Sequence, residues 1–160
     1  MARKKIKWGI HQLFLVPQRD GKYSTGVTLD LILPNIITCA FFDERVSNRD
    51  DIIISNYAKE DKLIALLSVS REQLDYGVWP IIGESSFRIA KSRLPNEEYR
   101  NKDWIGTKSY DAALVEDFLN AFYKLSPWDD WYDPNYLDKF LISPDKKPKD
   151  LIYIKKEKKR

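Results

Sequence analysis

Residues 11–42, HQLFLVPQRDGKYSTGVTLDLILPNIITCAFF, decide the fold of this protein. They form three runs rich in β-branched and aromatic residues, and two breaks separate the runs. The first break contains Asp20-Gly21, a pair that is typical of hairpin turns, and the second is Pro34-Asn35. The pattern therefore predicts three consecutive strands, over residues 11–17, 23–33 and 36–42.

Shorter strand candidates continue as far as residue 90. Pro80 favours a sheet edge or a strand start for residues 77–83, because proline cannot donate a ladder hydrogen bond. Ser70 has Gln73 three positions later, a spacing that is typical of an N-cap and its helical turn. The remaining strand candidates are residues 52–56, 63–70 and 87–90.

One amphipathic helix is expected after the strands, from residue 109 or 110 to residue 125. Ser126-Pro127 predicts its end. Its apolar residues recur every three or four positions, as on one face of an α-helix: Leu114, Val115, Phe118, Leu119, Phe122 and Leu125. We therefore expect a single domain over residues 1–160 with a mostly β (α+β) fold. The helix would cover a small, strongly curved antiparallel sheet or partial barrel built from residues 9–90.

Composition narrows the classes of function. The chain has 160 residues, of which 43% are hydrophobic and 32% are charged, as in one globular domain. A single cysteine excludes an intrachain disulfide, and a single histidine excludes the usual multi-histidine metal site. No apolar run approaches the roughly 20 residues of a membrane span, and the basic N-terminus is unlike a secretory signal peptide. We expect a cytoplasmic protein without a cofactor.

The charges are segregated along the chain. Residues 1–8 carry a net charge of +4, and residues 143–160 carry a net charge of +5. Residues 109–138 hold seven acidic side chains and one lysine, a net charge of −6. The last basic residues, 155–160, follow an apolar run at 151–154 that predicts a final short strand. The body is thus acidic, and its two ends are basic.

The aromatic-acidic segment at residues 128–138 is the most unusual part of the sequence. Large rings with few rotamers are favoured anchors at interfaces, and carboxylates attract a basic protein surface. We therefore expect a partner-binding surface made of Trp128, Asp129, Asp130, Trp131, Tyr132 and Asp133, with Asp117 from the helix. The alternative is that Trp128, Trp131 and Tyr136 pin a long loop while the acids face water. Carboxylates suit Mg²⁺ or Ca²⁺, but this spacing matches no EF-hand loop, so we expect no metal.

Side chains for catalysis are scarce. His11 is the one histidine that could activate a nucleophile, and it lies in a predicted strand, where a structural role is commoner. Cys39 lies between Thr38 and Ala40 and is interpreted as a small buried hydrophobic residue. The six glycines form no phosphate-binding pattern. We expect a protein that is not an enzyme.

Short motifs between residues 9 and 90 carry a resemblance to a known family. They are Gly9 with Leu13-Phe14-Leu15-Val16-Pro17, then Asp20-Gly21-Lys22-Tyr23 followed by Gly26, then Phe41-Phe42-Asp43, and Gly77-Val78-Trp79-Pro80-Ile81-Ile82-Gly83. The chain resembles the immunity protein 26 family of bacterial polymorphic toxin systems, some members of which are named phosphotriesterase. Ile10 departs from the Gly-Asp pair that the family has at the first motif. The last third of the chain, with the aromatic-acidic segment, lies outside the resemblance.

The resemblance implies a mostly β cytoplasmic protein that neutralises a bacterial toxin by binding it, and it carries over no catalytic residue. A phosphotriesterase activity is not expected, because activating water for it usually takes metal ions held by several ligands, typically histidines. The leading hypothesis is an immunity protein whose acidic, aromatic-rich surface binds a cognate toxin, a basic enzyme such as a nuclease. The alternative is a nucleic-acid-binding β-barrel module that uses Trp8 and the basic residues at 3–7 and 155–160. A third hypothesis, a hydrolase of small esters, depends on His11.

Overall fold

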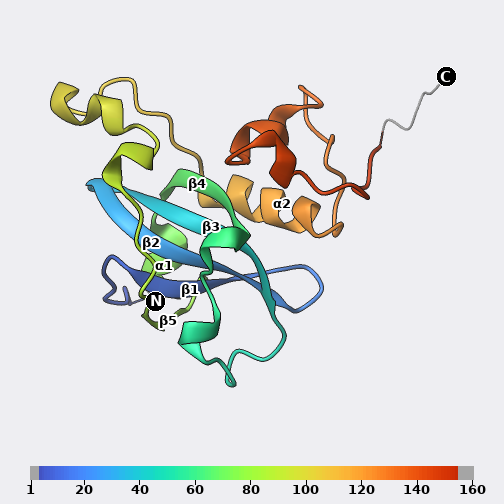
Figure 1. The fold of residues 1–160 in the computed structure, drawn as a ribbon, viewed down its shortest axis with the longest axis horizontal. Helices are drawn as coiled ribbons and strands as arrows, with labels where there is room; N and C mark the ends of the chain where they lie inside the picture. The colour runs from blue at the N-terminus through green and yellow to red at the C-terminus, as the bar shows by residue number, and fades with distance from the viewer. Residues whose placement is uncertain (1–3, 155–160) are drawn as a thin grey trace.

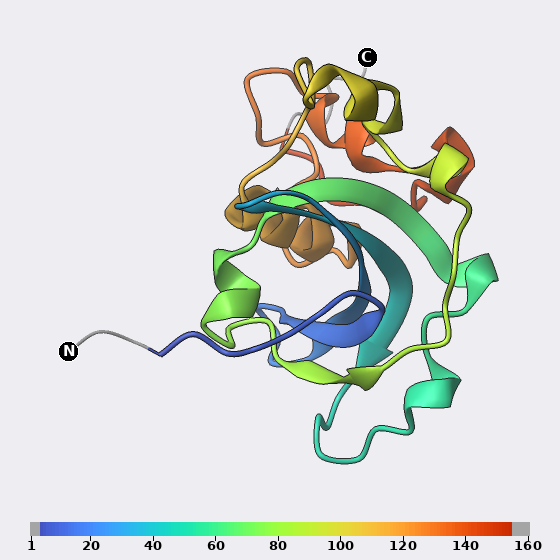
Figure 2. The same cartoon turned by 90° about the vertical axis from the view of Figure 1, so that its left-hand side faces the viewer.

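The computed structural model describes residues 4–154, which form a five-stranded antiparallel sheet with one main helix (Figure 1). The strand order is β4-β3-β2-β1-β5. The bounds are β1 (Gln12–Pro17), β2 (Tyr23–Leu33), β3 (Ile36–Val46), β4 (Leu63–Ser70) and β5 (Ile81–Glu84). The sheet curves strongly, but β4 and β5 remain its two edges and it does not close into a barrel (Figure 2). The predicted mostly β fold with a curved antiparallel sheet is confirmed, and the sheet stays open.

The helices are short apart from one. The amphipathic helix is α2 (Ala112–Phe122), and α1 (Glu72–Asp75) is a single turn. Short 3₁₀ helices lie at η1 (Ile54–Asn56), η2 (Glu60–Lys62), η3 (Lys91–Arg93), η4 (Glu97–Lys102), η5 (Tyr136–Phe140) and η6 (Pro144–Lys146). Within residues 4–154, no helix combines the length and the apolar character that a membrane crossing requires. The basic tail at 155–160 lies outside the described residues.

The first three strands follow the predicted pattern of turns. In the hairpin between β1 and β2, Gly21 has a φ of +85°, a conformation that glycine adopts without strain. The turn is closed by two hydrogen bonds, from Gly21 N to Gln18 O at 3.0 Å and from Gln18 N to Lys22 O at 2.9 Å. The chain then reverses between β2 and β3 at Pro34-Asn35. Local turn chemistry therefore sets the order of β1, β2 and β3.

Both faces of the sheet are buried, and neighbouring side chains enter different cores. Phe14 and Phe41 pack on the face that carries α2, whereas Leu13 and Ala40 pack on the opposite face. The pairing of β2 with β3 shifts register at three places, and such bulges increase the local twist and bend. Gly26 lies in β2 between two of these shifts, where a Cβ atom would be 2.5 Å from Cζ of Phe14. Close packing at this point requires glycine.

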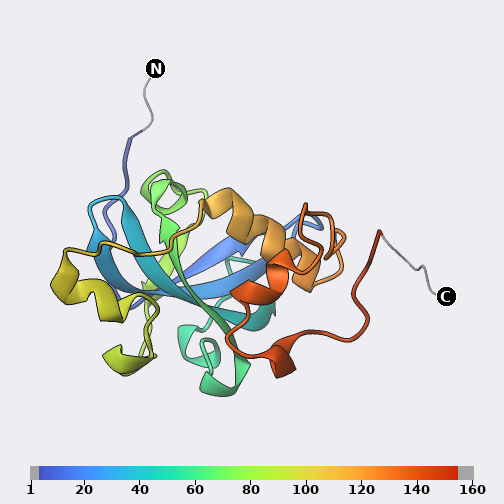
Figure 3. The same ribbon diagram turned by 90° about the horizontal axis from the view of Figure 1, so that it is seen from above.

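The helix α2 and the segment after it cover the first face. Their core contains Phe118, Trp128 and Phe140, together with Trp79, whose ring stacks on Phe14 with centroids 5.4 Å apart. Residues 123–151 (orange to red) pack beside α2 (Figure 3). The second face is covered by the loops around η1 and by residues 85–94. The first core therefore joins residues from both ends of the described chain.

The β4 edge of the sheet is sealed by later parts of the chain. Tyr110 N donates to Ser68 O at 2.9 Å, and Ser70 N donates to Tyr110 O at 3.0 Å. Further along the strand, Ile142 N donates to Ile64 O at 2.7 Å. These bonds occupy edge groups that could otherwise pair with another chain.

Several predicted elements are wrong or displaced. Residues 52–56 form the 3₁₀ helix η1 with its flanks, and residues 87–90 belong to no strand. Residues 151–154 are not a strand either, because they make only isolated hydrogen bonds to the segment before them. A segment rich in β-branched and aromatic residues forms a strand only where a neighbouring strand can pair with it. These three segments pack against the body without such a partner strand.

The predicted cap at Ser70 serves a different helix. Arg71, not Ser70, precedes α1, and Ser70 Oγ accepts a hydrogen bond from Ala112 N at 2.9 Å. Ser70 therefore caps α2 from a distance of 42 residues along the chain. The helix α2 is also shorter than predicted, ending at Phe122, and Lys124 then takes a φ of +64°.

Candidate functional site

The aromatic-acidic segment follows α2 and turns back along it. Its residues do not share one orientation. Trp128 is completely buried, its ring lies 5.8 Å from that of Phe118, and its Nε1 donates to Asp138 Oδ1 at 2.8 Å. Asp129 is also buried, and its Oδ1 accepts a hydrogen bond from Ile154 N at 2.7 Å. The prediction that Trp128 and Asp129 contact a partner is thus corrected, because both hold the segment onto the body.

Two further acids of the −6 segment also serve the fold. Glu116 Oε2 accepts hydrogen bonds from Gln73 Nε2 and Trp79 Nε1, both at 2.8 Å. Asp138 forms an ion pair with Lys147 Nζ at 2.9 Å in addition to its bond from Trp128. Each of these carboxylates satisfies a donor that burial has removed from water, and such donors are costly to leave unpaired. The alternative in which rings pin a loop is therefore correct for Trp128.

The remaining predicted site residues are accessible. Tyr132 is fully exposed, and Asp130 and Asp133 are exposed beside it. Trp131 is half-buried, with its ring 5.1 Å from that of Tyr136. Four of the predicted residues of the segment therefore remain available to a partner.

A cavity of about 300 Å³ joins this segment to α2 and to the first hairpin. We call it the acidic pocket. It is lined by Arg19, Asp117, Ser126, Pro127, Asp130 and Trp131. Two carboxylates and one indole ring thus face the same hollow, which is the arrangement that binds a lysine or arginine side chain well.

Arg19 is the one charged residue of the pocket lining that the sequence did not indicate. The hairpin turn that carries it is clamped to the end of α2, since Asn120 Oδ1 accepts from Arg19 N and Gln18 Nε2 donates to Leu119 O, both at 3.0 Å. Arg19 Nη2 lies 3.9 Å from Asp117 Oδ1, and the two side chains are 58% and 46% exposed. Such an exposed pair is worth about 1 kcal/mol or less. A cation from outside can therefore displace Arg19 at little cost.

Asp130 is the more available of the two carboxylates. No cationic side chain within residues 4–154 forms an ion pair with it. Asp133 lies 3.9 Å from Lys139 Nζ, again with both side chains largely in solvent. The negative charge of this region is thus only weakly compensated by the described part of the chain.

The C-terminal segment adds an apolar border that was not expected from the sequence. Trp128 N donates to Ile152 O at 2.8 Å, which with the bond to Asp129 ties residues 152–154 beside the segment that lines the pocket. Ile152 and Ile154 are 44% and 54% exposed. The predicted strand at 151–154 is instead an irregular segment beside Trp128 and Asp129, in which Leu151 is buried and the three residues after it are exposed.

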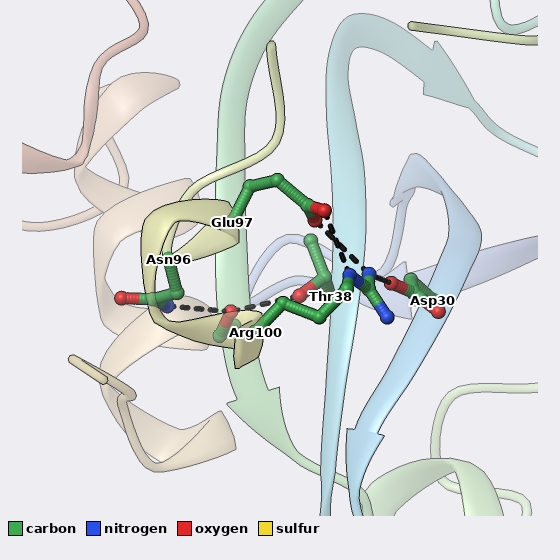
Figure 4. A network of polar contacts seen from close by, with 6 residues as sticks. Asp30, Thr38, Asn96, Glu97 and Arg100 are labelled. Atoms are coloured by element: carbon green, nitrogen blue, oxygen red, sulfur yellow. Dashed lines mark hydrogen bonds and ion pairs between the residues drawn. The ribbon is translucent and has the colours of Figure 1, made fainter. Parts of the chain in front are cut away.

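A separate polar cluster fastens the loop that precedes α2 (Figure 4). Arg100 Nη2 forms an ion pair with Asp30 Oδ2 at 2.5 Å, and Arg100 Nε forms one with Glu97 Oε2 at 2.7 Å. The hydrogen bond from Arg100 lowers the pKa of Glu97, and the same contacts raise the pKa of Arg100. The Arg100 guanidinium also lies 4.8 Å from the centre of the Trp104 ring. The charged groups of Asp30, Glu97 and Arg100 are therefore paired with one another within the cluster.

The second part of this cluster holds the start of the same loop. Asn96 Nδ2 donates to Ser68 Oγ at 3.0 Å and to Lys108 O at 2.8 Å, and Thr38 and Ser68 share a hydrogen bond of 2.8 Å. Asn96 has a φ of +67°, a strained conformation that these bonds hold in place. The cluster in Figure 4 is thus a structural clamp between the sheet and the loop.

His11 and Cys39, considered for catalysis, and Trp8, considered for nucleic-acid binding, do not line the acidic pocket. His11 directly precedes β1 with a φ of +63°, and burial, with the nearby charge of Arg88, lowers its pKa. Cys39 is completely buried, and burial raises the pKa of its thiol. Trp8 donates from Nε1 to Asp75 at 2.9 Å, and the Arg71 guanidinium covers its ring at 4.7 Å. Its ring is thus already occupied by a side chain of the same protein.

No three histidine, cysteine, aspartate or glutamate side chains in residues 4–154 gather in a way that could hold a metal ion. Comparisons of the chain with protein-family models, with curated proteins and with solved structures found no match.

Proposed function

We propose that this protein is a cytoplasmic immunity protein that binds and neutralises a basic toxin through the acidic pocket and the exposed residues next to it. The observation that carries the proposal is the pocket itself, where Asp117, Asp130 and Trp131 face one hollow of about 300 Å³. Tyr132 and Asp133 extend this surface along the chain. The resemblance to the immunity protein 26 family supports the same function from an independent part of the sequence.

The chemistry of the pocket defines the contact. A lysine or arginine side chain of the toxin enters the hollow, displaces Arg19 from Asp117, and makes charge-assisted hydrogen bonds to Asp117 and Asp130. The indole of Trp131 attracts the same cation through its ring face. Because water leaves the pocket on binding, these interactions become stronger than the exposed pair they replace.

The charge distribution also supports a basic partner, because electrostatic attraction acts over distances longer than direct contact. The acidic residues of 109–138 attract a positively charged surface before contact and raise the association rate, an effect that salt screens. Neutralisation then follows from steric blocking of the toxin's cationic cleft.

The experiment measures, by calorimetric titration, binding to the product of the gene directly upstream, where the proposal expects a basic toxin. The variant D117N/D130N removes both pocket carboxylates and keeps their shapes, whereas D50N/D51N removes two exposed carboxylates of the loop after β3 and is the matched control. We expect the pocket variant to lose at least about tenfold in affinity, or about 1.4 kcal/mol, and the control to bind like the wild type. Equal affinities of the two variants would refute the proposed surface. Asp129 is left unchanged, because it holds the backbone of residue 154.

A further inference from the structure

The end of the described chain is bonded to Asp129, one residue before Asp130 of the acidic pocket. Ile154 N donates to Asp129 Oδ1 at 2.7 Å, and Asp130, which lines the pocket, is the next residue after Asp129. A second bond, from Trp128 N to Ile152 O at 2.8 Å, fixes the direction of this part of the chain. The chain therefore leaves the described structure next to Asp129, one residue away in sequence from the pocket lining.

The residues that follow are positively charged and complement the two carboxylates of the pocket. Residues 155–160 read KKEKKR, with five basic side chains and one acidic side chain. Six residues span up to roughly 20 Å when extended, so each of them is within reach of Asp130. A tethered group of this kind has an effective concentration of about a millimolar or more near its anchor.

We propose that the basic tail at 155–160 is a ligand of the acidic pocket of its own chain. A lysine or arginine of the tail places its cation between Asp117 and Asp130, against Trp131, and so competes with the basic partner. The inference rests on the proposed function, because it assigns to the tail the site that the partner uses. Each exposed ion pair contributes little, so a well-fitting toxin displaces the tail while weaker basic proteins are excluded.

The first experiment tests occupancy without any partner. A water-soluble carbodiimide joins a lysine amine to a carboxylate as an amide, and the carbodiimide takes up the lost water and becomes a urea. Mass spectrometry then locates the linked peptides. With the full chain at low concentration and low salt, we expect links from Lys155, Lys156, Lys158 or Lys159 to Asp130 or Asp117 within one molecule. Loss of these links at 0.5 M salt is expected from screening. Links from the tail only to other carboxylates, or only between two molecules, would overturn the proposal.

The second experiment measures competition with a labelled deca-lysine peptide by fluorescence anisotropy. The variant K156Q/K158Q/K159Q removes three positive charges from the tail, and K4Q/K5Q/K7Q removes three from the other end as the matched control. We expect the tail variant to bind the peptide about fivefold more tightly than the control variant, as the loss of two or three exposed ion pairs predicts. Equal tightening in both variants would show a net-charge effect alone and would contradict occupancy by the tail.

The two proposals fail in different ways. If D117N/D130N binds deca-lysine as well as the wild type does, the pocket is not the cation site and the proposed function loses its surface. If D117N/D130N loses binding but the tail and control variants bind alike, the pocket stands and only the tail proposal fails.

Discussion

Replacing Trp128 and Trp131 in turn separates the fold from the binding surface, although both residues belong to the same short segment. Trp128 is completely buried, whereas Trp131 is half-buried and lines the acidic pocket. A buried aromatic side chain removes about 150–250 Å² from water, which at about 25 cal/mol per Å² corresponds to about 4–6 kcal/mol. Trp128→Ala should therefore cost about 3–5 kcal/mol, a large part of a typical domain stability of about 5–15 kcal/mol.

Trp128→Phe is the more informative variant because it keeps most of the apolar volume. It loses the hydrogen bond from Nε1 to Asp138, and Asp138 retains its ion pair with Lys147. We expect the free energy of unfolding to fall by about 1–2 kcal/mol, with unchanged affinity for the basic partner. Trp131→Ala should lower the free energy of unfolding by only about 1 kcal/mol and should weaken partner binding about tenfold, through lost cation–π and apolar contacts.

Urea unfolding followed by far-ultraviolet circular dichroism gives the stabilities, and titration with the partner at 25 °C gives the affinities. Trp128→Phe should change mainly the free energy of unfolding, whereas Trp131→Ala should change mainly the affinity for the partner. A Trp128→Phe protein of wild-type stability with impaired binding would refute the assignment of Trp128 to the core and restore it to the interface.

Two further predictions concern the body of the fold. Gly26→Ala should destabilise the protein by about 1–3 kcal/mol, because the new Cβ would lie 2.5 Å from the Phe14 ring and 3.0 Å from Ala40 O; a denaturation midpoint equal to that of the wild type would contradict this packing. Burial, with the nearby charge of Asp43 and the hydrogen bond from Tyr123 to it, raises the pKa of Tyr123, so this phenol should stay neutral when exposed tyrosines ionise near pH 10. The pKa of Tyr123 is higher in the folded state than in the unfolded state. The stability that neutral Tyr123 contributes is therefore present below pH 10 and is lost as the pH rises above 10. In spectrophotometric titrations, the curves of the wild type and of Tyr123→Phe should differ only well above pH 10.

Predictions made from local signals agree best with the structure. The turn signals at Asp20-Gly21 and Pro34-Asn35 correctly separate β1, β2 and β3, because turn conformation depends on a few adjacent residues. The apolar stripe of α2 likewise predicts which face is buried. The ends of α2 are less well predicted, since Ser70 caps its start from a distant strand.

The candidate site was predicted in part. Asp117, Asp130 and Trp131 were expected from composition and do line one pocket. Arg19 was not expected, because it reaches the pocket through a hairpin that is clamped to α2 about 100 residues later. Asp129 was assigned to the surface, and no local signal distinguishes it from Asp130.

The elements whose formation depends on neighbours along the chain could be predicted from the amino acids alone: the hairpin, the long central strands and the apolar face of α2. The packing of distant segments sets which of two adjacent aspartates is buried and which is open, and it sets which hydroxyl caps the helix. The physical reason is that burial and hydrogen-bond partners are properties of positions in space. Trp128 and Trp131 have the same side chain and almost the same sequence surroundings, yet the packing of Phe118 against one of them makes it core and leaves the other beside the acidic pocket.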